Sequence, residues 1–287
     1  MLDWFENTWQ LVYDFIGKTV TTTFPFLHII LLVMAGCFGS MLYGKIKPAY
    51  QSALLRALGI ASVLMGASEI WDSFFILQTG QFETDGTMLV IIALILGYVF
   101  GDSLALDRSI GKLGVRIYRI FTKSSTPTAT SVGSKNLQVS ERKPANPPSA
   151  EGFMLATLIC ACSGSTLRYT LEYESMADPI PLLVKLGFGF AVFFLLAAIY
   201  GSNAIYAAIP VFAVEGILLL INFVWGGFWT VTLLRQMALI GAVLLTSTGI
   251  SLGLSKKVRA ANFIPAFFVP VVYSLIMLLV DMLIKTE

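Results

Sequence analysis

The chain has 287 residues, of which 56% are hydrophobic and only 13% are charged, and its formal net charge is +2. Soluble domains average roughly 25% charged residues, so this composition, with a mean hydropathy of +0.80, predicts a protein that crosses the membrane several times. The small net charge argues against nucleic acid as a partner. We therefore expect an all-α bundle of transmembrane helices in the lipid bilayer.

Residues 1–24 are predicted to form an interfacial amphipathic helix that lies on the membrane surface. Its apolar side chains share one helical face, and its polar side chains lie largely opposite. The apolar face consists of Leu2, Phe5, Trp9, Val12, Tyr13 and Ile16. Because the segment lacks the basic start and small-residue cleavage site of a secretory signal, we interpret it as a surface helix.

Eight segments are apolar and long enough to be predicted as membrane spans. They run approximately from 26 to 43, 55 to 75, 88 to 105, 152 to 167, 182 to 201, 204 to 226, 236 to 254 and 262 to 284. The stretch from 186 to 234 contains 48 uncharged residues out of 49. Since one crossing uses about 20 residues, we assign two spans to this stretch.

The basic residues predict the orientation of these spans. Fourteen of the 19 Lys and Arg residues lie at three connections, around 45–56, between 102 and 151, and around 256–259. The connections between them carry acidic residues instead, at 69–85 and 172–178. By the positive-inside rule the basic connections are cytoplasmic, and with eight spans both termini then lie outside.

Two segments that do not cross the membrane are predicted after the third span. Residues 108–123 have one basic and one apolar face, which is typical of a helix that binds anionic lipids at the cytoplasmic face. Residues 122–150 are rich in Ser, Thr and Pro, so we predict a disordered linker. The chain then divides into the surface helix at 1–24, a first membrane half at 25–121, the linker at 122–150 and a second membrane half at 151–287.

Two of the predicted spans begin alike. Leu54-Leu55-Arg56 and Leu233-Leu234-Arg235 each open a helix rich in Ala, Gly, Leu and Ser. In the predicted topology these two helices run in opposite directions, so spans one to three and six to eight are hypothesised to be inverted repeats. Many secondary transporters place a binding site at the bilayer midplane between such repeats. A chance match between two Leu-rich helices is the alternative.

Glu215 is the main candidate for a functional residue. It is the only charged residue between 186 and 234, and it lies near the middle of the predicted span 204–226. Ionisable residues at that depth are costly and usually functional, so we interpret Glu215 as a proton or cation site. A structural carboxylate that is hydrogen-bonded to a neighbouring helix is the alternative. Pro210 removes a backbone donor five residues earlier and can free carbonyl groups in the same helix for a ligand.

Three asparagines are secondary candidates for substrate or ion binding. They are Asn203, Asn222 and Asn262. All three lie nearer to the predicted span ends, where helix capping or interfacial hydrogen bonding is the alternative role.

Three acidic residues near span ends complete the candidate set. Asp102, near the inner end of the third span, is predicted to pair with Arg108 or Lys112, and a gating role is the further hypothesis. Glu69 and Asp72, near the outer end of the second span, form either an acidic vestibule that attracts cations or an ordinary interfacial pair.

Several chemistries are excluded at the level of motifs. His28 is the only histidine, and its place at the start of the first span predicts an interfacial position. The chain contains no His-Glu-x-x-His pattern, Walker motif or dinucleotide-binding glycine fingerprint. We therefore expect no metal site, no cofactor and no enzymatic activity.

Seven short pieces, taken in order, resemble a bacterial membrane protein family designated domain of unknown function 554. They are GCFG at 36–39, ALGI at 57–60, MG at 65–66, LGYVFGD at 96–102, EGF at 151–153, AIPVF at 208–212 and NFIPAFFVP at 262–270. The resemblance implies a protein of the bacterial cytoplasmic membrane that is suspected of transport. The N-terminal helix and the length of the linker depart from the family pattern, and no residue role follows from the resemblance.

These observations together predict a secondary transporter or channel-like carrier of a small solute, coupled to protons or another cation. A membrane adaptor that binds a partner protein or anionic lipid, without transport, is the alternative. The solute itself is not predicted, and the oligomeric state stays open, with a homo-oligomer as one alternative.

Overall fold

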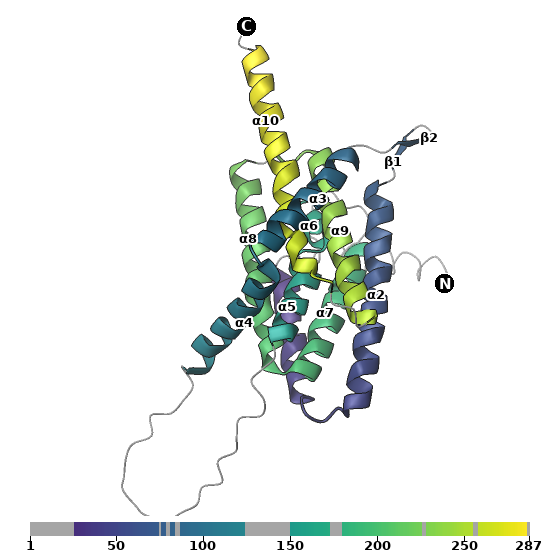
Figure 1. Ribbon diagram of the computed structural model, residues 1–287, viewed down its shortest axis with the longest axis vertical. Helices are drawn as coiled ribbons and strands as arrows, with labels where there is room; N and C mark the ends of the chain where they lie inside the picture. Colours follow the sequence, from purple (N-terminus) through teal and green to yellow (C-terminus); the bar gives the residue numbers. More distant parts are fainter. Residues whose placement is uncertain are drawn as a thin grey trace, which may run out of the picture.

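The computed structural model describes residues 26–74, 76–78, 81–83, 87–123, 150–172, 180–225, 228–254 and 258–285. These residues form a bundle of helices with one small β-hairpin (Figure 1). The all-α prediction is thereby confirmed for the bundle. The predicted surface helix at 1–24 and almost all of the predicted linker at 122–150 lie outside the described residues.

The bundle begins with an apolar helix over Phe26–Met41. The elements after it are α2 (Pro48–Phe74), β1 (Ile76–Gln78), β2 (Gln81–Glu83), α3 (Thr87–Ser103), α4 (Leu106–Lys123), α5 (Ala150–Ala161), α6 (Gly164–Glu172), α7 (Ile180–Tyr200), the 3-10 helix η2 (Ser202–Ala207), α8 (Ala208–Val224), α9 (Val231–Gly253), the 3-10 helix η4 (Ala260–Phe267) and α10 (Phe268–Lys285). Strands β1 and β2 pair antiparallel, and no strand was predicted there.

Among the described residues, five helices are long and apolar enough to cross a membrane. They are Pro48–Ser73, Leu182–Tyr200, Ser202–Val224, Val231–Gly253 and Ala260–Val280. A sixth span results if α3 and α4, which meet at an angle of 59°, are counted as one. The predicted number of eight is therefore not confirmed, because Phe26–Met41 and Glu151–Ala161 are shorter apolar helices. At 1.5 Å per residue they extend about 24 Å and 16 Å, less than the hydrocarbon core of about 30 Å.

Helix 26–41 and α7 both end at the same end of the bundle (Figure 1). We call it the basic end, because Arg56, Arg116 and Arg119 line a cavity there together with Tyr200, the last residue of α7. A Cβ built on Gly201, which follows α7, would lie 3.3 Å from the ring of Tyr43, which follows helix 26–41. Gly201 has φ of 82°, a conformation that glycine adopts without strain. The opposite end carries the connection between α8 and α9, where Trp225 stacks on Phe228 and Phe228 meets Trp229 edge to face. Tryptophans at helix ends are typical of membrane interfaces.

Helices α2 and α9 pack closely because glycines face each other along their contact. A Cβ on Gly59 would lie 2.7 Å from the carbonyl oxygen of Gly249, and a Cβ on Gly249 would lie 2.7 Å from that of Gly59. A Cβ on Gly66 would lie 2.9 Å from the carbonyl oxygen of Ala242. Small residues permit such close approach of membrane helices. The two helices run antiparallel, as predicted, while the inverted repeat itself stays a prediction.

The fourth predicted span, at 152–167, is interrupted in the structure. Helix α5 ends at Ala161, and α6 begins at Gly164. The break is held against α9, since a Cβ on Gly241 would lie 2.7 Å from the carbonyl oxygen of Cys162. Interrupted helices are tolerated in membrane proteins only where their free backbone groups are buried in protein or line a cavity. The break is therefore a candidate position for a ligand.

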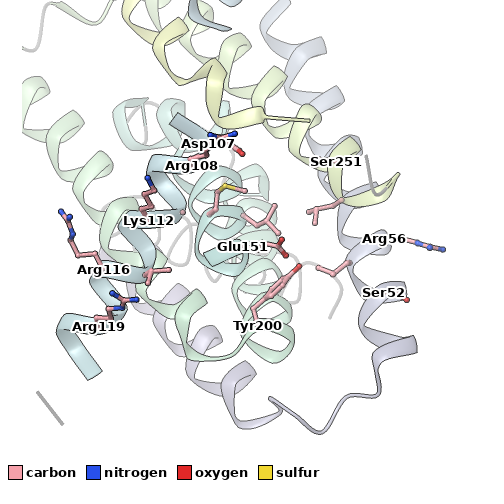
Figure 2. Close-up of a pocket in the computed structure, with 16 residues that line it drawn as sticks. Ser52, Arg56, Asp107, Arg108, Lys112, Arg116, Arg119, Glu151, Tyr200 and Ser251 are labelled. Carbon is pink, nitrogen blue, oxygen red and sulfur yellow. The ribbon is translucent and has the colours of Figure 1, made fainter. Parts of the chain in front are cut away.

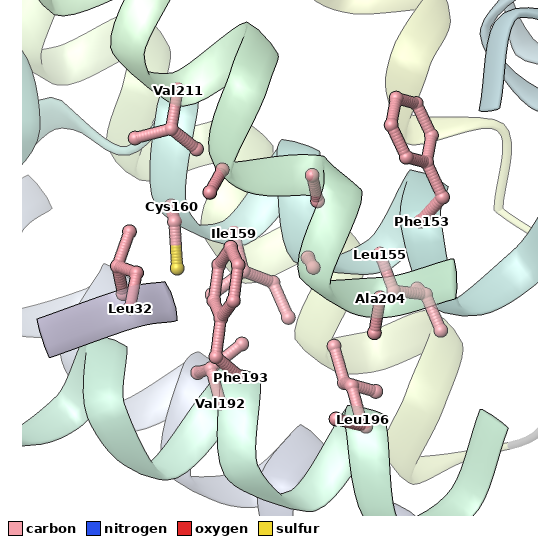
Figure 3. Close-up of a cluster of buried hydrophobic side chains, with 14 of the residues drawn as sticks. Leu32, Phe153, Leu155, Ile159, Cys160, Val192, Phe193, Leu196, Ala204 and Val211 are labelled. Atoms are coloured by element: carbon pink, nitrogen blue, oxygen red, sulfur yellow. The ribbon is translucent and has the colours of Figure 1, made fainter. Parts of the chain in front are cut away.

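The main hydrophobic core lies between helix 26–41, α5, α7 and α8. Figure 3 shows Leu32, Cys160, Phe193 and Val211 as part of this core, and all four are at most 1% exposed. Large apolar side chains are instead exposed on the outside of the bundle, as for Phe223 at 89%. In a membrane these side chains face lipid, so exposure here is consistent with a folded membrane protein.

The contact between α2 and α9 predicts a clear stability difference between two glycines. Replacing Gly59 with Ala forces backbone atoms apart and is expected to destabilise the protein by about 1–3 kcal/mol. Gly187→Ala in α7 is the matched control, because a Cβ at that position meets nothing within 4 Å. Thermal unfolding of the detergent-purified variants checks this, and an equal effect of both substitutions would contradict the close contact.

Candidate functional site: an ionisable cluster in the bundle core

Glu215 is paired with His28. The Nδ1 atom of His28 and the Oε1 atom of Glu215 lie 2.5 Å apart, and the two side chains are 0% and 1% exposed. Glu215 is the eighth residue of α8, and His28 is the third residue of helix 26–41. The first helix therefore begins beside the middle of α8. A contact of this kind needs one hydrogen between the two atoms, because a carboxylate oxygen can only accept.

Lys185 is a second buried ionisable residue, and its exposed fraction is 1%. Its ammonium group donates a hydrogen bond to the hydroxyl of Ser163, in the break between α5 and α6. The Ser163 and Thr166 hydroxyls lie 2.9 Å apart, and Thr166 donates to the carbonyl oxygen of Cys160 at 2.7 Å. This chain of hydrogen bonds ties α7 to the break and satisfies the last turn of α5.

Glu69 of α2 is the third partner. Both of its carboxylate oxygens are buried, and neither accepts a hydrogen bond in the structure; the same is true of Oε2 of Glu215. Burial of Lys185 disfavours its ammonium charge, and the carboxylates of Glu69 and Glu215 act on that charge electrostatically in the opposite direction. We call His28, Glu69, Lys185 and Glu215 the core ionisable cluster. Four helices contribute one member each.

Apolar residues close the cluster on the side of the basic end. Leu32 lies one turn after His28, and Val211 lies one turn before Glu215, on helices that run in opposite directions. Leu32, Val211 and Cys160 all belong to the main core (Figure 3). Toward the opposite end, a second apolar group surrounds Leu218 and Phe228. The cluster thus lies between two apolar layers, and charges in such surroundings are stable only when paired or balanced.

A cavity of about 1050 Å³ opens at the basic end, between α2, α4 and α5. Its lining includes five basic and two acidic side chains: Arg56, Asp107, Arg108, Lys112, Arg116, Arg119 and Glu151. In Figure 2, Glu151 and Tyr200 point toward each other in the middle, while the charged ends of Lys112 and Arg116 point away from Glu151. The Tyr200 hydroxyl lies on the side of the Glu151 carboxylate (Figure 2).

Comparison with known proteins assigns the chain to a family. The family DUF554, described as protein of unknown function, matches residues 24–275. The chain belongs to the DUF554 family. It is similar to the uncharacterized membrane protein YdfK of Bacillus subtilis (strain 168), with 22% identity over 243 residues, which cover 85% of this chain and 91% of that protein. No solved structure matches.

In the structure of this DUF554 protein, the predicted residues Glu69 and Glu215 both act electrostatically on Lys185. The predicted residues Asp102 and Asn262 are hydrogen-bonded to each other. Asp72 is exposed at the end of α2. Pro210 does not break its helix, because it is the third residue of α8, where the backbone N–H has no partner within the helix. The irregular backbone instead lies before it, in the 3-10 helix η2.

The three predicted asparagines lie apart from the cluster members named above. Asn203 and Asn262 are buried near the starts of η2 and η4, and Asn222 is half-buried near the end of α8. The Asn262 amide donates to Oδ1 of Asp102 at 3.0 Å, and Arg259 donates to the same oxygen at 2.8 Å. The prediction that Asp102 pairs with Arg108 or Lys112 is wrong, because the loop before η4 places Arg259 beside it.

Sequence reasoning missed His28 and Lys185. The predicted interfacial position of His28 is wrong, because its side chain is fully buried against Glu215. Lys185 lies four residues inside the predicted span 182–201, and a lysine at that place was a usable signal. Ser163 had no such signal, since a serine in a membrane helix is common. Among the described residues, no group of three or more His, Cys, Asp and Glu side chains could hold a metal ion.

The burial of the His28–Glu215 pair predicts strong coupling between its members. His28→Leu or Glu215→Leu alone leaves one ionisable group unpaired in the core and is expected to destabilise the protein by about 3–5 kcal/mol. The double variant removes both groups and is expected to cost at least about 1 kcal/mol less than the sum. Thermal unfolding in detergent measures all three variants. Additive effects would show that the two side chains do not interact.

Proposed function

We propose that this protein is a secondary carrier that moves a small solute across the membrane together with a proton. The observation that supports this most is the core ionisable cluster, since Glu69, Lys185 and Glu215 lie on helices long and apolar enough to span a membrane. Four ionisable side chains in such a place are costly for stability. Their pairing limits this cost, but an apolar core of the same volume is commonly as stable or more stable. A functional role for the cluster explains why it is there.

The His28–Glu215 pair is the group that would bind the coupled proton. It joins the first membrane half to the second, because helix 26–41 and α8 lie on opposite sides of the linker. A second proton on this pair converts it from a carboxylate and an imidazolium into a carboxylic acid and an imidazolium. The contact is then weaker, since it loses one charge. Protonation would thus favour separation of the two helices.

The interrupted helix and the apolar layers support the same proposal. A carrier needs a site that is closed toward both sides in one state and opens toward each side in turn. The cluster lies between two apolar layers, and the break between α5 and α6 places backbone groups beside Lys185. We propose that the basic end faces the cytoplasm. We also propose that α2 and α9 are the corresponding helices of an inverted repeat.

Helix α4 suggests an additional contact with anionic lipid. Its basic side chains Arg108, Lys112, Arg116 and Arg119 are all exposed. Juxtamembrane basic residues are each worth about 1 kcal/mol of attraction to a negatively charged leaflet. The alternative function, in which the protein is an adaptor without transport, requires such a contact. A carrier whose helix α4 lies on the membrane surface would make the same contact.

Reconstitution into liposomes distinguishes the carrier from the adaptor. In liposomes loaded with a pH-sensitive dye, and screened against a panel of small solutes, the wild-type protein is expected to move protons with at least one solute. Glu215→Gln is expected to abolish this coupled flux while the protein still inserts, because the amide cannot take up the proton. Lys47→Gln, at an exposed position just before α2, is the control and should retain the flux.

An adaptor gives the opposite pattern. No solute would then produce a proton flux. In cells, deletion of residues 122–150 would have the same effect as loss of the whole protein, whereas Glu215→Gln would not. A flux that is unchanged in Glu215→Gln would overturn the role assigned to the pair.

A further inference from the structure

We infer that the cavity at the basic end holds one anionic phospholipid from the surrounding bilayer. The lipid phosphate lies among the basic side chains of α4, and the first part of the acyl chains lies against the apolar walls. This is a discrete site for one molecule, in addition to the general attraction of α4 to a charged leaflet. It rests on the proposed position of α4 at the membrane surface, but not on transport.

Helix α4 is fixed beside the cavity by its turn and by its opposite face. It leaves α3 at an angle of 59°, after a turn in which Ala105 has φ of 48°, a left-handed conformation that is uncommon for alanine. Toward the bundle, a Cβ on Gly114 would lie 2.5 Å from the ring of Phe153. The rings of Tyr118 and Tyr206 meet edge to face, with centroids 5.9 Å apart. The cavity is therefore a built feature of the fold and not a gap beside a loose helix.

The cavity has apolar walls. Leu155 is buried and the other apolar lining side chains are half-buried; together they are Leu55, Val115, Met154, Leu155 and Leu252. Contact with hydrocarbon is more favourable for such side chains than contact with water. Drug-sized ligands occupy pockets of roughly 300–1,000 Å³, so a volume of about 1050 Å³ accommodates a lipid headgroup and the start of its chains. The rest of each chain stays in the bilayer.

The charges around the cavity favour a phosphate group. The five basic and two acidic side chains of the lining leave an excess of positive charge. Lys112, Arg116 and Arg119 follow one another at helical spacing on α4, and all three are exposed. Guanidinium groups bind two phosphate oxygens at once. Basic pockets between membrane helices on the cytoplasmic side are typical sites for the headgroups of anionic lipids.

Glu151 argues against a soluble polyanion as the ligand. Its carboxylate lies in the middle of the cavity, whereas the charged ends of Lys112 and Arg116 point away from it (Figure 2). A nucleotide or polyphosphate that filled the cavity would bring negative charge against Glu151. Phosphatidylglycerol carries a single negative charge, and the hydroxyl groups of its headgroup can donate to a carboxylate. It is therefore the phospholipid that we choose as the probe.

Lipid binding to the wild-type protein tests the inference. The full-length protein is purified in detergent, stripped of lipid and titrated with phosphatidylglycerol in mixed micelles. At about 100 times its Kd the lipid is expected to raise the Tm by about 5 °C, and native mass spectrometry should count one bound molecule. Phosphatidylcholine with the same acyl chains has no net charge, and glycerophosphoglycerol has the same headgroup without the chains. Neither is expected to raise the Tm at the same concentration.

Two pairs of variants locate the lipid. Ser52→Trp adds an indole ring at a position of α2 that lines the cavity, whereas Ala53→Trp adds it at an exposed position outside the lining. Only Ser52→Trp is expected to abolish the effect of phosphatidylglycerol. Arg116→Gln should weaken binding about fivefold, the contribution of one juxtamembrane basic residue. Lys47→Gln, exposed and outside the lining, should not weaken it. If Ser52→Trp does not fold, the Arg116 and Lys47 pair still tests the site.

The outcomes separate this inference from the proposed function. No effect of phosphatidylglycerol, or an equal effect of phosphatidylcholine, overturns the inference even if the liposomes show proton flux. An equal effect of glycerophosphoglycerol would indicate a site for a soluble phosphodiester and also overturns it. An effect that folded Ser52→Trp retains in full would show only a general surface contact of α4. One saturably bound phosphatidylglycerol without any proton-coupled flux supports the lipid site and overturns the carrier instead.

Discussion

The pairing of buried charges is the constraint on which the rest of this structure depends. His28, Glu69, Lys185 and Glu215 come from four helices, and each is stable in the bundle only because an opposite charge or a hydrogen-bonding group lies beside it. Glu215 fixes the start of the first helix against the middle of α8. Lys185 fixes α7 against the break between α5 and α6. The arrangement of the bundle around its centre therefore follows from electrostatics as much as from apolar packing.

The glycine contacts supply the second constraint. Close approach of α2 to α9, and of α3 to η4, requires positions without side chains, as at Gly101, where a Cβ would lie 2.6 Å from the Cα of Asn262. In lipid, helices gain little from burying apolar surface, so close van der Waals contact carries the association. The same contact places Asn262 and Arg259 beside Asp102. Rigid contacts of this kind around a charged centre suit a protein in which whole helices move as units.

The sequence predicted the class of fold and singled out Glu215, which the structure buries against His28. Hydropathy predicted a segment over each apolar helix, although α2 begins at Pro48 rather than at 55 and α9 begins at Val231 rather than at 236. The lone carboxylate at 215 indicated one member of the core ionisable cluster. The sequence did not predict that the segments at 26–43 and 152–167 form short or interrupted helices. Both segments are apolar, and the structure places His28 of the first beside Glu215 and the break in the second beside Lys185, contacts that hydropathy does not report. Partners such as His28 and Asp102–Arg259 depend on contacts between residues more than 150 positions apart, which periodicity cannot report.

The central claim is that the cluster is buried but becomes reachable by water from each side in turn. Cys160 is a natural reporter, because its thiol is 1% exposed and lies within electrostatic reach of Lys185 and Glu215. In a Cys37→Ser, Cys162→Ala background, the measurement is the rate at which a charged, membrane-impermeant thiol reagent modifies Cys160 in oriented proteoliposomes. The account predicts slow but complete modification from either side, faster in Glu215→Gln. Complete protection of Cys160 from both sides, with full reaction after denaturation, would show a sealed structural cluster and contradict the account.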